Sequence, residues 1–133
     1  MSTELNYGLQ ATLDTTFEDT VIRVTEALKT EGFGILTKID MQATLKAKLD
    51  VNISNYIILG ACNPNLAYQA MQHEQTIGLL LPCNVIVYSE EASEKTHVAI
   101  LEPALMVQLT ENPALNDIAN DAHTRLERVI QSL

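Results

Sequence analysis

Apolar residues along the chain follow first a strand period and then a helix period. Residues 6–13 alternate roughly between apolar and polar positions, which predicts a β-strand. In residues 15–32 the apolar side chains instead recur every three or four positions, which predicts an amphipathic helix. Thr15 or Thr16 suits its N-cap, and Gly32 suits the left-handed residue that ends it.

The middle of the chain repeats this alternation of strand and helix. Residues 33–40 and 56–62 are predicted strands, and Asp40 is expected to cap a short helix over 41–49. Asn63 and Pro64 form a strong helix start, since asparagine caps well and proline at the first helical position loses no hydrogen bond. That helix is expected to bury Leu66, Ala67, Ala70 and Met71 and to end near residue 73.

The last third of the chain predicts a hairpin followed by a helix. Residues 83–90 and 96–103 are two expected strands joined by a polar segment, whereas 76–82 and 104–109 fit either a strand or a helical turn. Asn112 and Pro113 repeat the cap device and open a long amphipathic helix. The late hairpin favours an α+β fold, and residues 1–133 show no linker or repeat that would divide them into more than one domain.

Composition and charge restrict the function. The formal charge of −9 argues against nucleic-acid binding, which depends mainly on Lys and Arg. No apolar run is long enough to span a bilayer, and the first ten residues lack the basic and hydrophobic regions of a secretory signal. We therefore expect a cytoplasmic protein without a membrane partner, in which both cysteines are reduced thiols.

Two Cys-Asn pairs are the candidate chemical features. Cys62 ends a predicted strand just before a helix N-terminus, where amides can stabilise a thiolate, although a buried cysteine more often only packs. Asn63 is explained as a helix cap. Cys83 and Asn84 open the next strand, and Asn84 lacks a local structural role, so it is the better indication of a pocket. If these strands are antiparallel neighbours, the two thiols could lie close together.

Other catalytic and metal-binding patterns are weak or missing. A metal site of Cys62, Cys83 and His97 can be drawn, but zinc sites usually contain closely spaced ligand pairs, so no metal is expected. No phosphate-binding glycine loop, paired carboxylates or nucleophile–base arrangement occurs, and nothing identifies a cofactor. A binding function is therefore favoured over an enzymatic one.

Three segments resemble a known family. They are GFGILTKIDMQATLKAKLDV (32–51), YIILGACNPNLAYQAM (56–71) and IGLLLPCNVIVY (77–88), and in this order they resemble the bacterial and archaeal domain of unknown function 302 across residues 6–130. The resemblance implies a curved, mainly antiparallel sheet with helices packed on one face and a topology like that of the TATA-binding protein. It also implies a homodimer, and it brings no established activity, cofactor or catalytic residue.

Three functional hypotheses follow. The first is a homodimeric binding module for a small ligand or a protein partner, with a pocket near Cys62, Asn63, Cys83 and Asn84. The second is thiol or sulfur chemistry, with Cys62 as the reactive thiol and Cys83 as its partner. The third is a purely structural interaction domain, in which the Cys-Asn segments serve only the fold.

Overall fold

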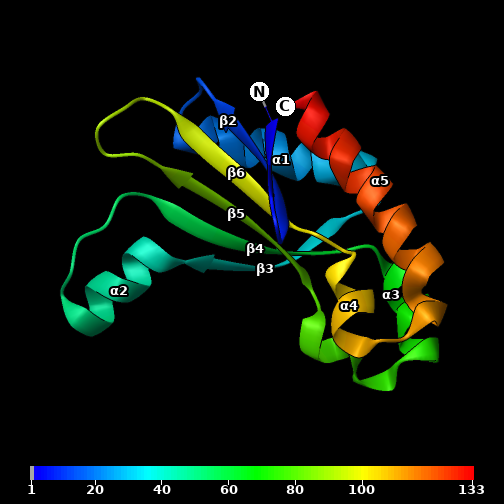
Figure 1. The fold of residues 1–133 in the computed structure, drawn as a ribbon. Coiled ribbons are helices and arrows are strands. Elements are labelled where there is room, and N and C mark those ends of the chain that lie inside the picture. The colour runs from blue at the N-terminus through cyan, green and yellow to red at the C-terminus, as the bar shows by residue number, and fades with distance from the viewer. Residues whose placement is uncertain (1) are drawn as a thin grey trace.

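The protein has one six-stranded antiparallel sheet. The structure is a computed structural model that describes residues 2–133, with side chains from Leu5 onward. The strands lie in the order β1-β2-β6-β5-β4-β3 (Figure 1). Their bounds are β1 Ser2–Leu5, β2 Gly8–Leu13, β3 Gly34–Asp40, β4 Tyr56–Cys62, β5 Cys83–Ser89 and β6 Thr96–Leu101.

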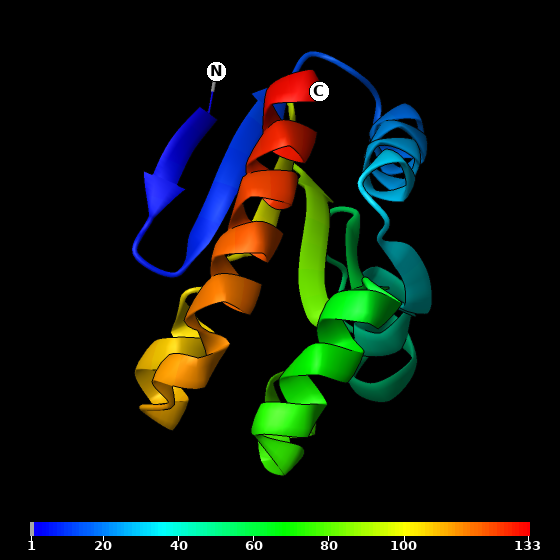
Figure 2. The same ribbon diagram turned by 90° about the vertical axis from the view of Figure 1, so that its right-hand side faces the viewer.

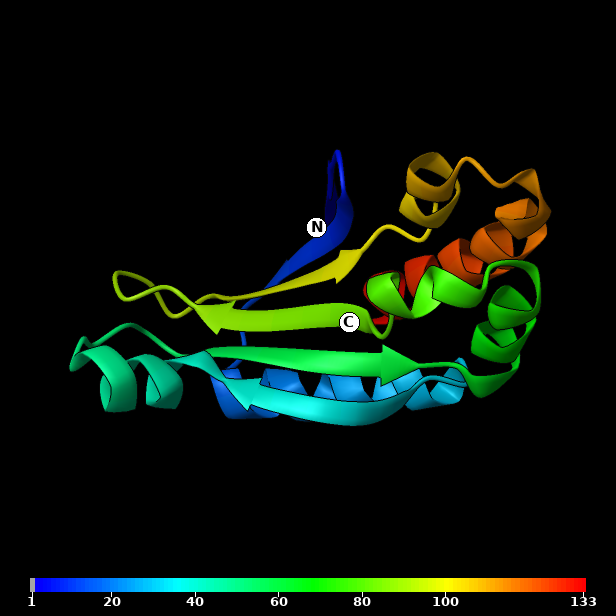
Figure 3. The ribbon, with the colours of Figure 1, turned by 90° about the horizontal axis from the view of Figure 1, so that it is seen from below.

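Helices cover one face of this sheet. Helices α1 and α5 contact the strands and each other, and α3 packs beside α5 (Figure 2). The helical segments are α1 Phe17–Thr30, α2 Met41–Leu49, α3 Pro64–His73, α4 Leu105–Thr110 and α5 Asn116–Ser132, with 3₁₀ turns η1 Gln75–Leu80 and η2 Pro113–Leu115. Seen from below, α2 lies at one end of the sheet, while α3, α4 and α5 gather at the other (Figure 3). The α+β fold class, with a mainly antiparallel sheet and helices on one side, is confirmed.

The core lies between the sheet and these helices. Strand alternation points every second side chain toward the helices, and on the central strands these are fully buried β-branched and aliphatic residues. They are Leu59, Val85, Val87, Val98 and Ile100. The side chains between them point to the other face of the sheet, which we call the open face, and Ile58, Ile86 and Ala99 there are only half-buried.

The helix signals of the sequence act as predicted. Thr16 accepts a hydrogen bond from Asp19 N at 3.1 Å, and Asp40 accepts one from Ala43 N at 2.9 Å. Gly32 has a φ of 85°, the left-handed conformation that glycine adopts without strain, and it ends α1.

Several elements differ from the sequence prediction. Strand β1 was not expected, and its hairpin with β2 starts the second strand at Gly8 rather than at residue 6. Residues 76–82, left open, fall mainly in a 3₁₀ turn, and 104–109 fall mainly in α4. Met71 was expected to be buried, but 52% of it is exposed because α3 turns that side away from the core. No helix in the described part of the chain is long and apolar enough to cross a membrane.

Candidate functional site

A cavity of about 170 Å³ lies at the end of the sheet where the Cys-Asn segments meet. Strand β4 ends at it, β5 begins beside it and β6 ends on it, while α3, α4 and α5 form the remaining walls. These three helices surround the same end of the molecule in Figure 1. The wall is almost entirely apolar, and Glu102 is the only charged residue among those that line it.

Small side chains on facing helices leave this space open. Ala67 and Ala70 on α3 face the cavity, and Ala122 on α5 lies opposite. Larger neighbours such as Leu66 and Leu126 are buried around them and hold the helices apart. The apolar stripe of α5 packs into the core, and where this stripe carries alanine the short side chain leaves a gap.

The two cysteines border the cavity, but their side chains diverge. In the antiparallel β4–β5 ladder Cys83 pairs with Ala61, so these two side chains share the helix-covered face of the sheet. Cys62 is the next residue along β4, and strand alternation directs its side chain to the other face. Both cysteines are free thiols.

Neither thiol is activated. Burial raises the pKa of the Cys62 thiol, despite its place just before a helix N-terminus. Burial, and then the negative charge of Glu102, raise the pKa of Cys83 to about 12, so that this thiol stays neutral at physiological pH. The Cys83 thiol donates to the carbonyl oxygen of Leu101 at 3.7 Å. These surroundings favour packing by both cysteines rather than nucleophilic chemistry.

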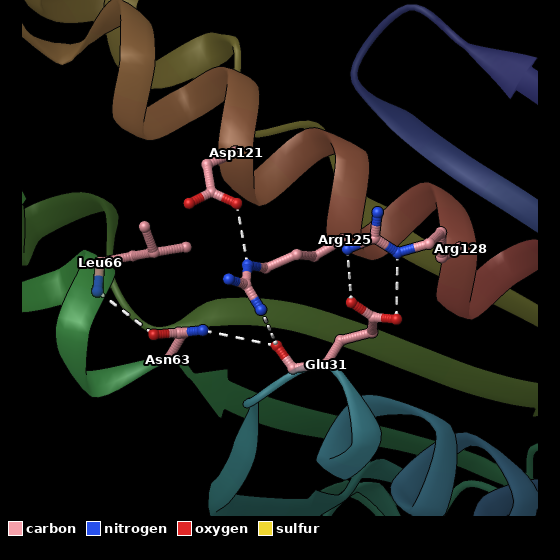
Figure 4. A network of polar contacts seen from close by, with 6 residues as sticks. All are labelled: Glu31, Asn63, Leu66, Asp121, Arg125 and Arg128. Carbon is pink, nitrogen blue, oxygen red and sulfur yellow. Dashed lines mark hydrogen bonds and ion pairs between the residues drawn. The ribbon is translucent and has the colours of Figure 1, made fainter.

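Asn63 joins three helices. Its side-chain oxygen accepts the Leu66 backbone N–H at 3.2 Å, which confirms the predicted cap of α3. Its amide nitrogen donates to the carbonyl oxygen of Glu31 at 3.4 Å, and Arg125 of α5 donates to the same oxygen at 3.2 Å (Figure 4). Both ends of the Asn63 amide are thereby used in holding α1, α3 and α5 together.

Asn84 is not part of the pocket. It pairs with Gly60 on the open face of the sheet, is exposed to solvent and does not line the cavity. The sequence analysis took Asn84 as an indication of a pocket, but an exposed amide can bond to solvent and does not require one.

The metal triad drawn from the sequence is also not assembled. His97 pairs with Tyr88 at the far end of β5, five residues from Cys83, a separation of about 16 Å along a strand. Among the described residues no group of three His, Cys, Asp or Glu could hold a metal ion. His97 instead hydrogen-bonds Thr12 at 2.9 Å and pairs with Glu90.

The sequence reasoning missed a charged cluster at the cavity. His123 Nδ1 lies 2.7 Å from Glu102 Oε1, and its Nε2 lies 3.3 Å from Glu127 Oε2. Partial burial opposes protonation of His123, but the hydrogen bond and charge of Glu102, assisted by Glu127, raise its pKa. One feature of the sequence could have indicated this cluster: His123 lies beside the apolar stripe of the last helix, four residues before Glu127. Glu102 itself lies too far away in sequence to be paired with it.

Comparison with known proteins identifies the family. Residues 9–133 match the model of the family described as "Domain of unknown function DUF302". The crystal structure of an uncharacterised conserved DUF302 protein from Bacillus stearothermophilus is 29% identical in sequence, with a TM-score of 0.86 over 96% of this chain and 98% of that one. No curated protein is significantly similar. The family model and the shared fold agree, and the chain belongs to the DUF302 family.

Proposed function

We propose that the protein binds a small, largely apolar molecule in the cavity between α3, α4, α5 and the ends of β4, β5 and β6. The observation that carries this proposal is a cavity of about 170 Å³ with an almost wholly apolar wall. Tightly packed interiors contain few voids larger than a water molecule. An engineered apolar cavity of about 150 Å³ stays dry and binds benzene, so a cavity of this size suits a ligand of one small ring or a short branched chain.

Toluene is a suitable first probe because it is apolar and close to benzene in size. We expect saturating toluene to shift the amide resonances of residues that line the cavity and to raise the unfolding midpoint. A ligand at ten times its Kd stabilises the native state by about 1.4 kcal/mol. Ala67→Leu, which places a larger side chain in the cavity, should abolish both effects and by itself stabilise the fold by about 1 kcal/mol.

Ala47→Leu is the matched control, since Ala47 is exposed on α2 at the opposite end of the sheet. It adds the same apolar atoms without entering the cavity, and its toluene response should equal that of the unchanged protein. If toluene leaves the resonances and the stability of the unchanged protein unaffected, the cavity is only a packing gap. The purely structural interaction domain is then the better description.

A second copy of the chain is the partner that we propose for the open face. Strand register places no Lys, Arg, Asp or Glu on this face along β2 to β6, although the chain carries 25 such residues. Its centre is aliphatic, and Tyr56, Tyr88 and His97 stack across three strands with ring centroids 5.5 and 5.0 Å apart. In a chain with a charge of −9, a face whose strands carry no charged side chain, with only the Glu90 carboxylate against His97 at its edge, is where two copies can meet with least repulsion. Sedimentation analysis should give twice the chain mass of 14.7 kDa.

Thiol chemistry is not favoured as the function. The raised pKa of Cys62, the neutral Cys83 thiol and the divergence of the two side chains all work against a nucleophile with a resolving partner. The cytoplasmic location stays a prediction from the sequence.

A further inference from the structure

Glu102 is the single charged residue among those that line the cavity. It follows β6 directly, and its backbone N–H donates to the carbonyl oxygen of Tyr7 at 3.0 Å, which fixes the chain where β6 ends. Its carboxylate accepts the Ala104 N–H at 3.1 Å and lies 2.7 Å from His123 Nδ1. Only 18% of the side chain is exposed. Glu102 is therefore held in one position in the cavity wall, with its carboxylate against His123.

This carboxylate can still accept a hydrogen bond from a ligand. An ionised carboxyl group offers about four lone-pair sites and no donor. His123 Nδ1 lies near both oxygens and Ala104 N donates to one of them, so at most three of these sites are used. The groups near it are His123 of α5, with Glu127 on the other side of the imidazole, and the neutral Cys83 thiol of β5. One imidazolium against two carboxylates leaves the cluster negative even when His123 is protonated.

The nearby arginines do not reverse this sign. Arg125 pairs with Asp121 at 2.8 Å, and Arg128 pairs with Glu31 at 2.8 Å. Neither arginine lines the cavity. An apolar ligand that ends in an anionic group would meet repulsion at the one charged residue of the wall, whereas a cationic donor would meet a fixed acceptor.

We propose that the ligand class of this cavity is a small apolar amine, with its hydrocarbon part among the leucines and alanines and its ammonium group donating to Glu102. This inference rests on the proposed function, because it needs the cavity to bind a molecule at all. It goes further by naming the ligand's polar group and the residue that selects it.

Three ligands of similar size and different charge test the inference. Benzylamine, toluene and benzoate share a phenyl ring, and their affinities can be measured by the same amide resonance shifts at pH 7. Hydrogen bonds to charged groups are strong enough for benzylamine to bind on the order of tenfold more tightly than toluene. Benzoate should bind more weakly than toluene or not at all.

Glu102→Gln keeps the shape of the side chain and removes its charge. In this variant benzylamine should lose its advantage over toluene, while the affinity for toluene stays unchanged. His123→Gln is the matched variant, because it leaves the Glu102 carboxylate in place and should keep the preference for the amine. If Glu102→Gln fails to fold, the ranking of the three ligands by the unchanged protein still decides the question.

The outcomes separate this inference from the proposed function. If none of the three ligands binds, the proposed function fails and this inference fails with it. If toluene binds as tightly as benzylamine, or if Glu102→Gln keeps the amine preference, the cavity binds apolar molecules without selecting an amine. That result overturns this inference alone.

Discussion

At the scale of single residues, the two asparagines that look alike in the sequence have opposite environments. Asn63 is buried, and both ends of its amide are bonded, to Leu66 N and to Glu31 O. Asn84 is exposed on the open face. The cap role of Asn63 followed from its place before a proline at a helix start, but its second bond, across to α1, is a tertiary contact.

A double-mutant cycle tests the coupling between Asn63 and Gly32. A Cβ atom at Gly32 would lie 2.9 Å from Asn63 Nδ2, and the residue has a φ of 85°. We expect Gly32→Ala to destabilise the protein by about 1–2 kcal/mol, and Asn63→Ala by about 1 kcal/mol through the lost cap.

The double variant should be less destabilised than the sum of the two, by at least about 0.5 kcal/mol, because removing the amide also removes the clash. Urea unfolding measures all three. Additive losses would show that the Gly32–Asn63 contact carries no energy. Asn84→Ala, at an exposed site, is the control and should change stability by less than about 0.5 kcal/mol.

At the scale of elements, α5 is held by polar contacts along its length as well as by its buried stripe. In the middle of α5, His123 pairs with Glu102. Further along the helix, Arg125 donates to the carbonyl oxygen of Glu31 at the end of α1, and Arg128 binds the Glu31 carboxylate through two nitrogens at 2.8 and 3.1 Å. The hydrogen bond from Arg128 holds the pKa of Glu31 below its usual range. These contacts fix α5 over the strands and over one side of the cavity.

The pairing of His123 with Glu102 predicts a pH-dependent stability. Because the folded-state pKa of His123 is raised, its contribution is full below the unfolded-state pKa of about 6.5 and is lost as pH rises through the folded-state pKa. His123→Gln should therefore destabilise the protein more at pH 5.5 than at pH 9, by less than about 1 kcal/mol, because the pair is still partly exposed to solvent.

Urea unfolding of the two proteins at both pH values measures this difference. In a Glu102→Gln background the same substitution should lose most of its pH dependence, since the main partner of His123 is then uncharged. An effect of equal size at both pH values would mean that the imidazole contributes by packing and not by charge.

At the scale of the whole molecule, the sheet has one face covered by helices and one face without charged side chains on β2 to β6. Ile86→Lys places a charge in the middle of the open face and should convert a dimer to a monomer in sedimentation analysis without unfolding the chain. Ile22→Lys is the matched control, since Ile22 is 55% exposed on α1 and lies away from this face. If the two variants have equal masses, the open face is not the dimer interface.

The sequence alone determined most of the elements, because their signals are local. The caps at Thr16, Asp40 and Asn63 and the left-handed Gly32 each act within four residues of a helix end, so the helix boundaries followed from them. The resemblance of three segments then predicted the family and the α+β fold. Short pieces without such signals, β1, η1 and α4, were missed or left open because contacts with distant segments decide them.

Only the tertiary structure decided the site. Strand register places Cys83 opposite Ala61 and sends the Cys62 side chain to the other face, which no reading of neighbouring residues could reveal. The cavity arises where alanines on α3 and α5 happen to face each other, and Glu102 reaches His123 across 21 positions of sequence. The sequence predicted that a site would lie where the two strand ends meet. Packing between distant segments decided that an apolar cavity with one carboxylate lies there, rather than a pair of facing thiols.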